Sequence, residues 1–207
     1  MTVLSVSQDG DLQDRERAKR ARFPVIIAAL LGLVGAMVMG HGLWIKGKAV
    51  VAQILLSQAF EQSIALGIPV KPWRWADTWP IARIDVDRLH ASAIVLAGAS
   101  GQAMAFGPGH LSHTPLPGDN GTSVIAAHRD THFAFLKDLV IGDEISVTRA
   151  NGATTVFRVS GFTTTRWDAP GLDANASGTH LVLATCWPFD AVTPGPLRYL
   201  VKAEAVR

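Results

Sequence analysis

The sequence predicts an all-β domain, folded as a barrel or a sandwich, that follows an N-terminal membrane-spanning helix. Short β-type runs separated by turn residues succeed one another from about residue 80 to the C-terminus. An apolar segment without Asp, Glu, Lys or Arg occupies residues 23–45. Of the 207 residues, 48% are hydrophobic, so the chain can bury a core of ordinary size.

The composition also excludes several classes of function. The net charge is only +2, and the basic residues are spread along the chain apart from one N-terminal cluster, so nothing indicates a nucleic-acid-binding surface. The only cysteine, Cys186, excludes an intramolecular disulfide and any cysteine-cluster metal site. Cysteine count alone favours a buried structural thiol over a reactive one.

The N-terminal region is predicted to anchor the chain in a membrane. Residues 1–22 are polar, of mixed charge, and expected to form a disordered cytoplasmic tail. Residues 23–45, at about 1.5 Å per residue, are long enough to cross a hydrocarbon core of about 30 Å. A cleaved signal peptide is the alternative, but its apolar region is usually only about 7–15 residues long, so a retained single-pass anchor is favoured. The basic cluster before the span places the N-terminus in the cytoplasm and the rest of the chain on the extracytoplasmic or periplasmic side of the cell (inner) membrane.

Residues 46–71 are predicted to form a stalk helix and linker. This segment is rich in helix formers and has no Gly or Pro between Gly47 and Gly67, where the helix should end. A tryptophan-rich connector then opens the domain predicted over residues 72–207. Its tryptophans either lie near lipid headgroups or pack on the domain, and packing is favoured because buried aromatics supply much of a core's area. They are Trp73, Trp75 and Trp79.

The predicted strands are short apolar or alternating runs bounded by Gly, Pro, Asn or Asp. They span residues 80–86, 91–96, 122–128, 144–149, 154–159, 180–185 and 197–203. Asn151-Gly152 lies between two of them and predicts a tight β-hairpin. One short helix is expected at 133–139.

Three residues that lie in these predicted strands or directly after them are candidates for catalysis. Cys186 directly follows the apolar run 181–184, and a strand end is a rigid place for a nucleophile. A thiol with the ordinary pKa of roughly 8.5 is mostly protonated at neutral pH, so a catalytic cysteine requires a histidine or a cation nearby. His128 ends another strand, and Arg198 lies among apolar neighbours in the last one. Alone, each is better explained as a core-edge histidine or a solvent-facing arginine, but the combination favours a catalytic site.

The motifs around these residues resemble those of the sortases. Residues 107–118 contain Gly-Pro-Gly-His and Thr-Pro-Leu-Pro-Gly, and residues 124–131 read Val-Ile-Ala-Ala-His-Arg-Asp-Thr, which together resemble the region of the catalytic histidine. Residues 182–189, Val-Leu-Ala-Thr-Cys-Trp-Pro-Phe, resemble the Thr-Leu-x-Thr-Cys motif, although Val182 replaces the usual Thr. Arg198 matches the catalytic arginine of the following strand. The resemblance covers about residues 72–206 and is strongest to class D and E sortases and the related enzymes of marine proteobacteria.

The resemblance implies both a fold and a reaction. The fold would be a closed β-barrel of about eight strands with short helices. Cys186 would attack the carbonyl of an LPxTG-like sorting signal near the C-terminus of an exported protein, and His128 would give a proton to the leaving amine. Arg198 would hold the substrate and stabilise charge on the carbonyl oxygen. The acyl group would then pass from the thioester to an acceptor amine, without any cofactor or metal.

The second-tier candidates are His110, Asp130 and Thr185. His110 and Asp130 would order a loop or orient the histidine. Turn or capping roles are the alternative for His110 and Asp130. His113 and His132 are weaker candidates still, and a metal site is not expected, because no His-x-x-x-His helix or carboxylate partner accompanies them.

Two other functions stay open from the sequence. A cysteine endopeptidase that uses water would need the same three residues, so the sequence separates it poorly from a transpeptidase. A membrane-tethered β-domain that merely binds peptides would have an unreactive thiol, and the combination of Cys, His and Arg argues against it. The resemblance implies a dedicated client protein encoded nearby, but the sorting signal and the acceptor amine are not predicted.

Overall fold

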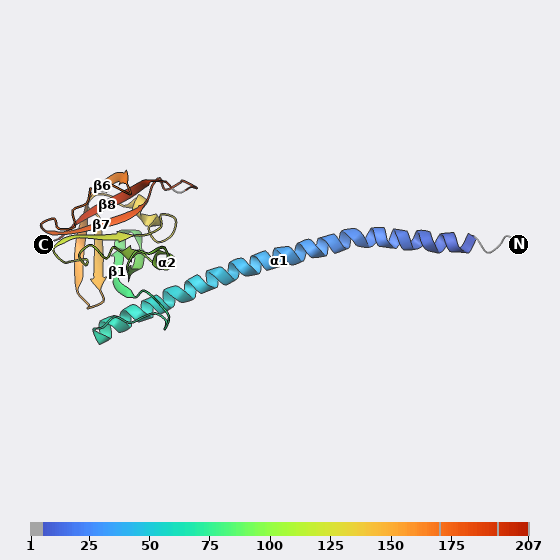
Figure 1. The fold of residues 1–207 in the computed structure, drawn as a ribbon, viewed down its shortest axis with the longest axis horizontal. Coiled ribbons are helices and arrows are strands. Elements are labelled where there is room, and N and C mark those ends of the chain that lie inside the picture. The colour runs from blue at the N-terminus through green and yellow to red at the C-terminus, as the bar shows by residue number, and fades with distance from the viewer. Residues whose placement is uncertain (1–5, 170, 194, 207) are drawn as a thin grey trace. The chain divides into compact units, whose positions relative to one another are not determined.

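The structure is a computed structural model that describes residues 6–169, 171–193 and 195–206. The chain divides into two compact units, Met1–Val50 and Val51–Arg207, and each is described by itself. Helix α1 (Val6–Leu66), blue to teal in Figure 1, forms the described part of the first unit and continues into the second. All strands belong to the second unit.

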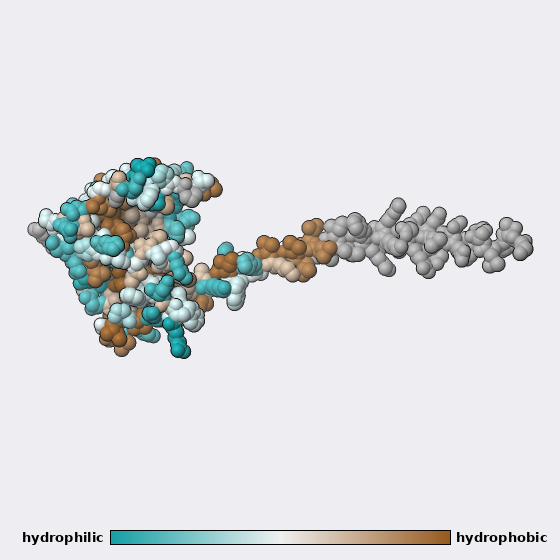
Figure 2. All heavy atoms as spheres, in the orientation of Figure 1, coloured by the Kyte–Doolittle hydropathy of each residue, from teal (hydrophilic) through white to brown (hydrophobic). Residues whose placement is uncertain are grey.

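Helix α1 carries the apolar segment that the sequence predicts as a membrane anchor. Its residues 30–66 form the one candidate, among the described residues, for a helix long and apolar enough to cross a membrane. The side chains from Leu30 to Ile45 are exposed, and most of them are hydrophobic, as the brown stretch in Figure 2 shows. A helix with apolar side chains all around its surface is suited to lipid rather than to water.

The N-terminal tail differs from the prediction. Residues 6–22 are helical, where the sequence predicts a disordered tail over residues 1–22, and residues 1–5 lie outside the described residues. The segment is rich in good helix formers, and the adjoining apolar helix removes the cost of nucleating a new one. Pro24 lies inside this helix.

The C-terminal part of α1, within the second unit, packs on the β-domain. Leu56 and Phe60 are fully buried in a cluster with Ile94, Leu96 and Ala103. The helix ends at Leu66, where Gly67 adopts a φ of 69° and donates to the carbonyl of Ser63 at 2.9 Å. The end of α1 at Leu66 and its packing on the β-domain both fit the predicted stalk helix.

The connector tryptophans differ in burial. Trp73 packs edge-on against Phe106, with ring centroids 5.2 Å apart, whereas Trp75 is 83% exposed. Trp79 is half-buried beside the first strand.

Eight strands close into a barrel in the order β1-β2-β3-β4-β7-β8-β6-β5. Two neighbouring pairs, β2/β3 and β4/β7, are parallel, and the other pairs are antiparallel. Figure 1 shows β6, β8 and β7 side by side in orange and red. The strands are β1 (Pro80–Val86), β2 (Ala91–Ala97), β3 (Gly109–His110), β4 (Gly121–Ala126), β5 (Glu144–Arg149), β6 (Thr154–Arg166), β7 (Thr179–Cys186) and β8 (Leu197–Ala205). The closed eight-stranded barrel predicted from the family resemblance is confirmed.

The short helices are η1 (Asp87–Leu89), α2 (Gly101–Met104) and η2 (Ala134–Asp138). The helix predicted at 133–139 is therefore a 3₁₀ helix. The β5–β6 hairpin turns at Asn151-Gly152 as predicted, and Gly152 has a φ of 82°. Helices η1 and α2 were not located from the sequence. Among the strands, β6 continues to Arg166 rather than ending at residue 159, and the unpredicted two-residue strand β3 pairs with β2 and β4.

The inward-facing side chains form the main core, and alternation along the strands leaves a second apolar surface outside it. On β4, Ile125 belongs to the barrel core, whereas Val124 packs with Val182 and Leu200 in a separate cluster. Because successive strand residues point to opposite faces, this cluster lies on the outer face of the β4-β7-β8 sheet. That surface is where the candidate site is built.

Candidate active site

Cys186 is the last residue of β7, and its thiol is half-buried and free. The strand ends here because Trp187-Pro188 follows, and a proline cannot continue the ladder. Ala184 and Cys186 are two residues apart, so both point to the outer face with the apolar cluster. The predicted mounting of the thiol at a strand terminus therefore agrees with the structure.

Arg198 lies directly opposite Cys186 in the antiparallel pair β7/β8. Opposed side chains point to the same face, with Cβ atoms roughly 4.5–5.5 Å apart. The Nη1 atom of Arg198 donates to the carbonyls of Gly195 at 2.9 Å and Leu197 at 2.8 Å. These two bonds orient the guanidinium before any substrate is bound.

His128 lies two residues beyond the end of β4, the other strand that pairs with β7. Strands β4 and β7 run parallel with Ala126 opposite Ala184, and His128 and Cys186 each lie two residues further on. Two bonds extend the pairing past the strand ends: the Ala127 amide donates to the Ala184 carbonyl at 3.1 Å, and Thr185 Oγ1 donates to the Ala127 carbonyl at 2.8 Å. The imidazole is exposed to solvent.

These three residues line one cavity of about 560 Å³. Its floor is apolar and comes from the outer face of the sheet: Val124, Ala126, Ala184 and Leu200. Its other lining residues come mainly from loops and the short helix α2: Ala99, Met104, Leu111, Ala127, Trp167, Leu172 and Thr185. Such a cavity can hold an apolar peptide segment beside the thiol, the imidazole and the guanidinium.

The second-tier residues have different positions. Thr185 is buried, and its hydroxyl joins the ends of the two strands that carry Cys186 and His128. Asp130 and His113 are exposed, and neither is among the described residues that line the cavity. His132 is half-buried, and burial together with the nearby charge of His128 lowers its pKa. Among the described residues, no group of three or more His, Cys, Asp or Glu side chains is arranged to hold a metal ion.

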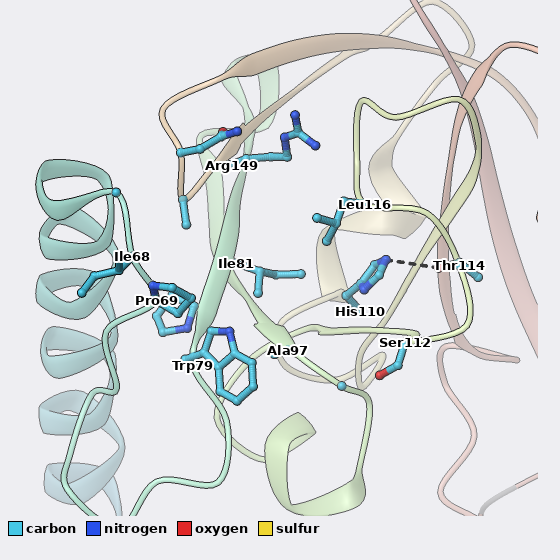
Figure 3. A pocket seen from close by; sticks show the side chains of 15 residues that line it. Ile68, Pro69, Trp79, Ile81, Ala97, His110, Ser112, Thr114, Leu116 and Arg149 are labelled. Atoms are coloured by element: carbon cyan, nitrogen blue, oxygen red, sulfur yellow. Dashed lines mark hydrogen bonds between the residues drawn. The ribbon is translucent and has the colours of Figure 1, made fainter.

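His110 lies away from the thiol, in a second cavity of about 500 Å³ (Figure 3). Its Nε2 is within hydrogen-bonding distance of the Pro115 carbonyl, at 2.9 Å, and of Thr114 Oγ1, at 3.2 Å. Burial lowers the pKa of His110, although the bond to the Pro115 carbonyl opposes this effect. Both contacts are to the segment that follows β3, and His110 does not line the cavity that contains Cys186.

Sequence reasoning missed the loop residues of the catalytic cavity. Leu111, Trp167 and Leu172 lie in segments without strand or helix periodicity, so their approach to the sheet depends on long-range contacts. The Leu172 loop, for example, is held by bonds from Thr122 on β4 to the carbonyls of Asp173 and Ala174. No local pattern in the sequence indicates such bonds.

Comparisons with known proteins agree on one family. The family model for the sortase domain matches residues 84–206. Sortase D of Bacillus subtilis (strain 168) is 26% identical over 123 residues, which cover 59% of this chain and 62% of that protein. The structure of sortase A from Corynebacterium diphtheriae is similar with a TM-score of 0.58 and 29% identity, over 66% of this chain and 64% of that chain.

A Clostridium perfringens sortase D5 transpeptidase has a similar fold, with a TM-score of 0.61 and 23% identity over 76% of this chain and 99% of that chain. The chain thus spans slightly less than two thirds of the length of the Bacillus protein and of the Corynebacterium structure.

Proposed function

The chain belongs to the sortase family, and from this membership and the cavity around Cys186 we propose that it is a membrane-anchored cysteine transpeptidase. It cleaves an LPxTG-like sorting signal near the C-terminus of an exported protein and joins the new C-terminus to an amine. The observation that carries the proposal is the convergence of Cys186, His128 and Arg198 on one apolar cavity from three adjacent strands.

The reaction consists of two acyl transfers. In the first, the thiolate of Cys186 attacks the scissile carbonyl carbon, and the tetrahedral intermediate collapses as the C–N bond breaks. Protonated His128 donates its proton to the departing amine, leaving a thioester on Cys186 and a neutral imidazole. In the second, an acceptor amine attacks the thioester, His128 takes the amine's proton, and the C–S bond breaks to regenerate the thiolate. One amide bond is exchanged for another, and no oxidant or cofactor is consumed.

Arg198 would support both steps because it pairs with Cys186 across β7 and β8 and lines the same cavity. The carbonyl oxygen becomes negative in each tetrahedral intermediate, and a fixed donor beside it lowers the barrier more than a donor that must reorganise. The bonds from Nη1 to the Gly195 and Leu197 carbonyls restrict this guanidinium, while its other N–H groups supply donors for the substrate.

The floor of the cavity supports an apolar sorting signal. Val124, Ala126, Ala184 and Leu200 present only small or medium aliphatic side chains, so a Leu-Pro segment can bury its side chains there. Each methylene buried contributes about 0.8 kcal/mol to binding. A strongly charged segment would find no partner on this floor.

The test uses the purified full chain, a fluorogenic Leu-Pro-x-Thr-Gly peptide library and an added amine. Cys186→Ala should abolish the thioester adduct detected by mass spectrometry, and His128→Asn should reduce turnover by at least two orders of magnitude. His113→Asn is the matched control, because it removes an exposed imidazole that does not line the cavity. The proposal is wrong if Cys186→Ala joins peptide to amine at the wild-type rate.

The same products decide between transpeptidation and hydrolysis. Water reaches the exposed His128, so some carboxylate product is expected when no amine is present. At saturating amine the joined product should predominate. Carboxylate as the only product under that condition would favour an endopeptidase, and an unreactive thiol without any adduct would favour a peptide-binding domain.

Helix α1 supports anchoring of this domain to the membrane. It is long and apolar enough to span the bilayer, and the basic residues that precede the apolar segment favour a cytoplasmic N-terminus. The lone thiol allows a direct test of sidedness. A membrane-impermeant maleimide should label Cys186 in intact spheroplasts, and should fail to label a Ser5→Cys/Cys186→Ala variant. The reverse pattern would show the opposite orientation.

A further inference from the structure

We propose that Arg129 is a positioning residue that fixes the guanidinium of Arg198 by holding the β7–β8 loop in place. This loop is defined here by its described residues, 187–193 and 195–196, and it connects Cys186 to Arg198. The proposal rests on the transpeptidase function proposed above, and it assigns a task to a residue that does not line the catalytic cavity.

Arg129 is unlike an ordinary surface arginine. It lies between two exposed residues, His128 and Asp130, yet its own side chain is partly buried. Its Nη2 donates to the carbonyl of Ala191 in the β7–β8 loop, and its Nη1 is shielded from solvent without a hydrogen-bond partner in the described structure. Burying a charged nitrogen without an acceptor is unfavourable, so the fold retains this inward conformation at a cost. The bond to the loop is the interaction that offsets it.

The loop is held at its two ends by other contacts. At its start, Trp187 and Phe189 pack on Tyr199 of β8, with ring centroids 5.4 and 5.3 Å apart. At its end, the Pro196 carbonyl accepts a bond from the Trp167 amide at 2.9 Å. Between them, Arg129 provides the side-chain contact from the His128 segment to the middle of the loop. Among the described residues of the loop, removal of this contact leaves the middle held through the contacts at the two ends.

The position of the loop determines the orientation of Arg198. One of the two carbonyls that receive the Arg198 Nη1 bonds belongs to Gly195, near the loop's end. A shift of the loop therefore moves an acceptor that orients the guanidinium opposite Cys186. Displacements of about 1 Å in catalytic groups can reduce rates by about a hundredfold. Arg129, which follows His128 in the sequence, thus links the segment of the catalytic histidine candidate to the loop that orients Arg198.

A double-mutant cycle on the full chain tests this connection. Arg129→Gln should lower kcat for the Leu-Pro-x-Thr-Gly peptide by about tenfold to a hundredfold, the range expected when a charged hydrogen bond is lost, with KM changed less than threefold. In an Arg198→Gln background, the same change should cost less than threefold, because the group that it positions is already missing. If the fold-losses in kcat of the two single variants multiply in the double variant, Arg129 does not act through Arg198.

Hydrogen exchange supplies a readout that needs no substrate. Arg129→Gln should speed amide exchange in the β7–β8 loop, while Arg129→Lys, which retains a cationic donor, should restore part of the protection. The matched control is Arg88→Gln, which removes a guanidinium bound to the Asp138 carbonyl and the Asp143 carboxylate elsewhere in the barrel and should leave the loop unchanged.

If the wild type cleaves no peptide, the proposed function fails on its own. If loop exchange in Arg129→Gln equals that of the wild type, the role proposed for Arg129 is wrong, whatever the substrate.

Discussion

Thr185→Val removes one hydroxyl from the junction of the two strands that carry Cys186 and His128. The side chain is 2% exposed, and its Oγ1 donates to the Ala127 carbonyl at 2.8 Å. Valine has nearly the same shape, so packing is retained while the donor is lost. The change therefore isolates a hydrogen bond that continues the pairing of β4 with β7 beyond Ala126 and Ala184.

The expected cost follows from burial. Ala127 is 6% exposed, so its carbonyl has little access to replacement water. Loss of a partner from a buried acceptor costs about 1–3 kcal/mol. We expect the free energy of unfolding to fall by about that amount. If the wild-type bond also holds His128 beside Cys186, a comparable loss in the transition state lowers the acylation rate by roughly 5- to 150-fold.

Stability is measured by urea denaturation of the full chain in detergent, and acylation by the rate at which the thioester accumulates in single-turnover experiments. Thr78→Val is the matched control, because Thr78 is 4% exposed and its Oγ1 donates to the Ala97 carbonyl at 2.8 Å, away from the thiol. Both variants should lose similar stability, but only Thr185→Val should lose more than fivefold in rate. Equal rates for both variants and the wild type would refute the alignment argument.

Two other predictions concern the stability of the β-domain. Phe60→Ala should lower the unfolding free energy by about 3–5 kcal/mol in urea titrations, because Phe60 is fully buried. The control is Ile54→Ala, at a site 52% exposed on the same helix, which should change the unfolding free energy little. Equal losses for the two variants would show that α1 does not pack on the barrel in solution. The guanidinium of Arg88 lowers the pKa of Asp143 in the folded state, so the carboxylate stabilises the fold above its ordinary pKa of about 3.9 and loses that effect as pH falls through the lower folded value. Asp143→Asn should therefore be less stable than the wild type at pH 7, with a difference that shrinks below about pH 4, and a pH-independent difference in thermal unfolding would contradict this.

The sequence could predict most strands because their signal is local. In β1, the residues from Pro80 to Val86 alternate between buried and half-buried positions, and the apolar run of β7 is bounded by turn residues. The hairpin at Asn151-Gly152 is local too, because Gly152 needs only the positive φ that glycine adopts readily. The candidate triad followed from strand ends in the same way, together with the motifs of a known family.

The remaining features could not be predicted because distant segments determine them. Strand β3 has only two residues, so it has no period to detect, and it is defined by pairing with β2 and β4, where Gly109 lies close to the backbone of residues 98–99. A Cβ at Gly109 would lie 2.4 Å from the Gly98 carbonyl oxygen. Residues 6–22 are polar and of mixed charge, which predicts disorder, but they contain good helix formers and adjoin the apolar helix, which removes the cost of nucleation. Arg129 gave no signal beyond its place in a motif, because its partner is 62 residues away in the sequence.

The parallel pairing of β4 with β7 explains why residues so far apart in sequence meet at one thiol. Both strands run toward the same end of the barrel, so His128 and Cys186, each two residues beyond a paired alanine, emerge together. An antiparallel pairing of the same six positions would separate the histidine from the thiol by nine residues along the strands, or about 30 Å at about 3.3 Å per residue. Strand β8 then enters antiparallel from that end, so its second residue, Arg198, pairs with the last residue of β7. His128, Cys186 and Arg198 thereby form a row at the ends of three adjacent strands, and in the proposed reaction a carbonyl over the central sulfur would have the histidine on one side and the arginine on the other.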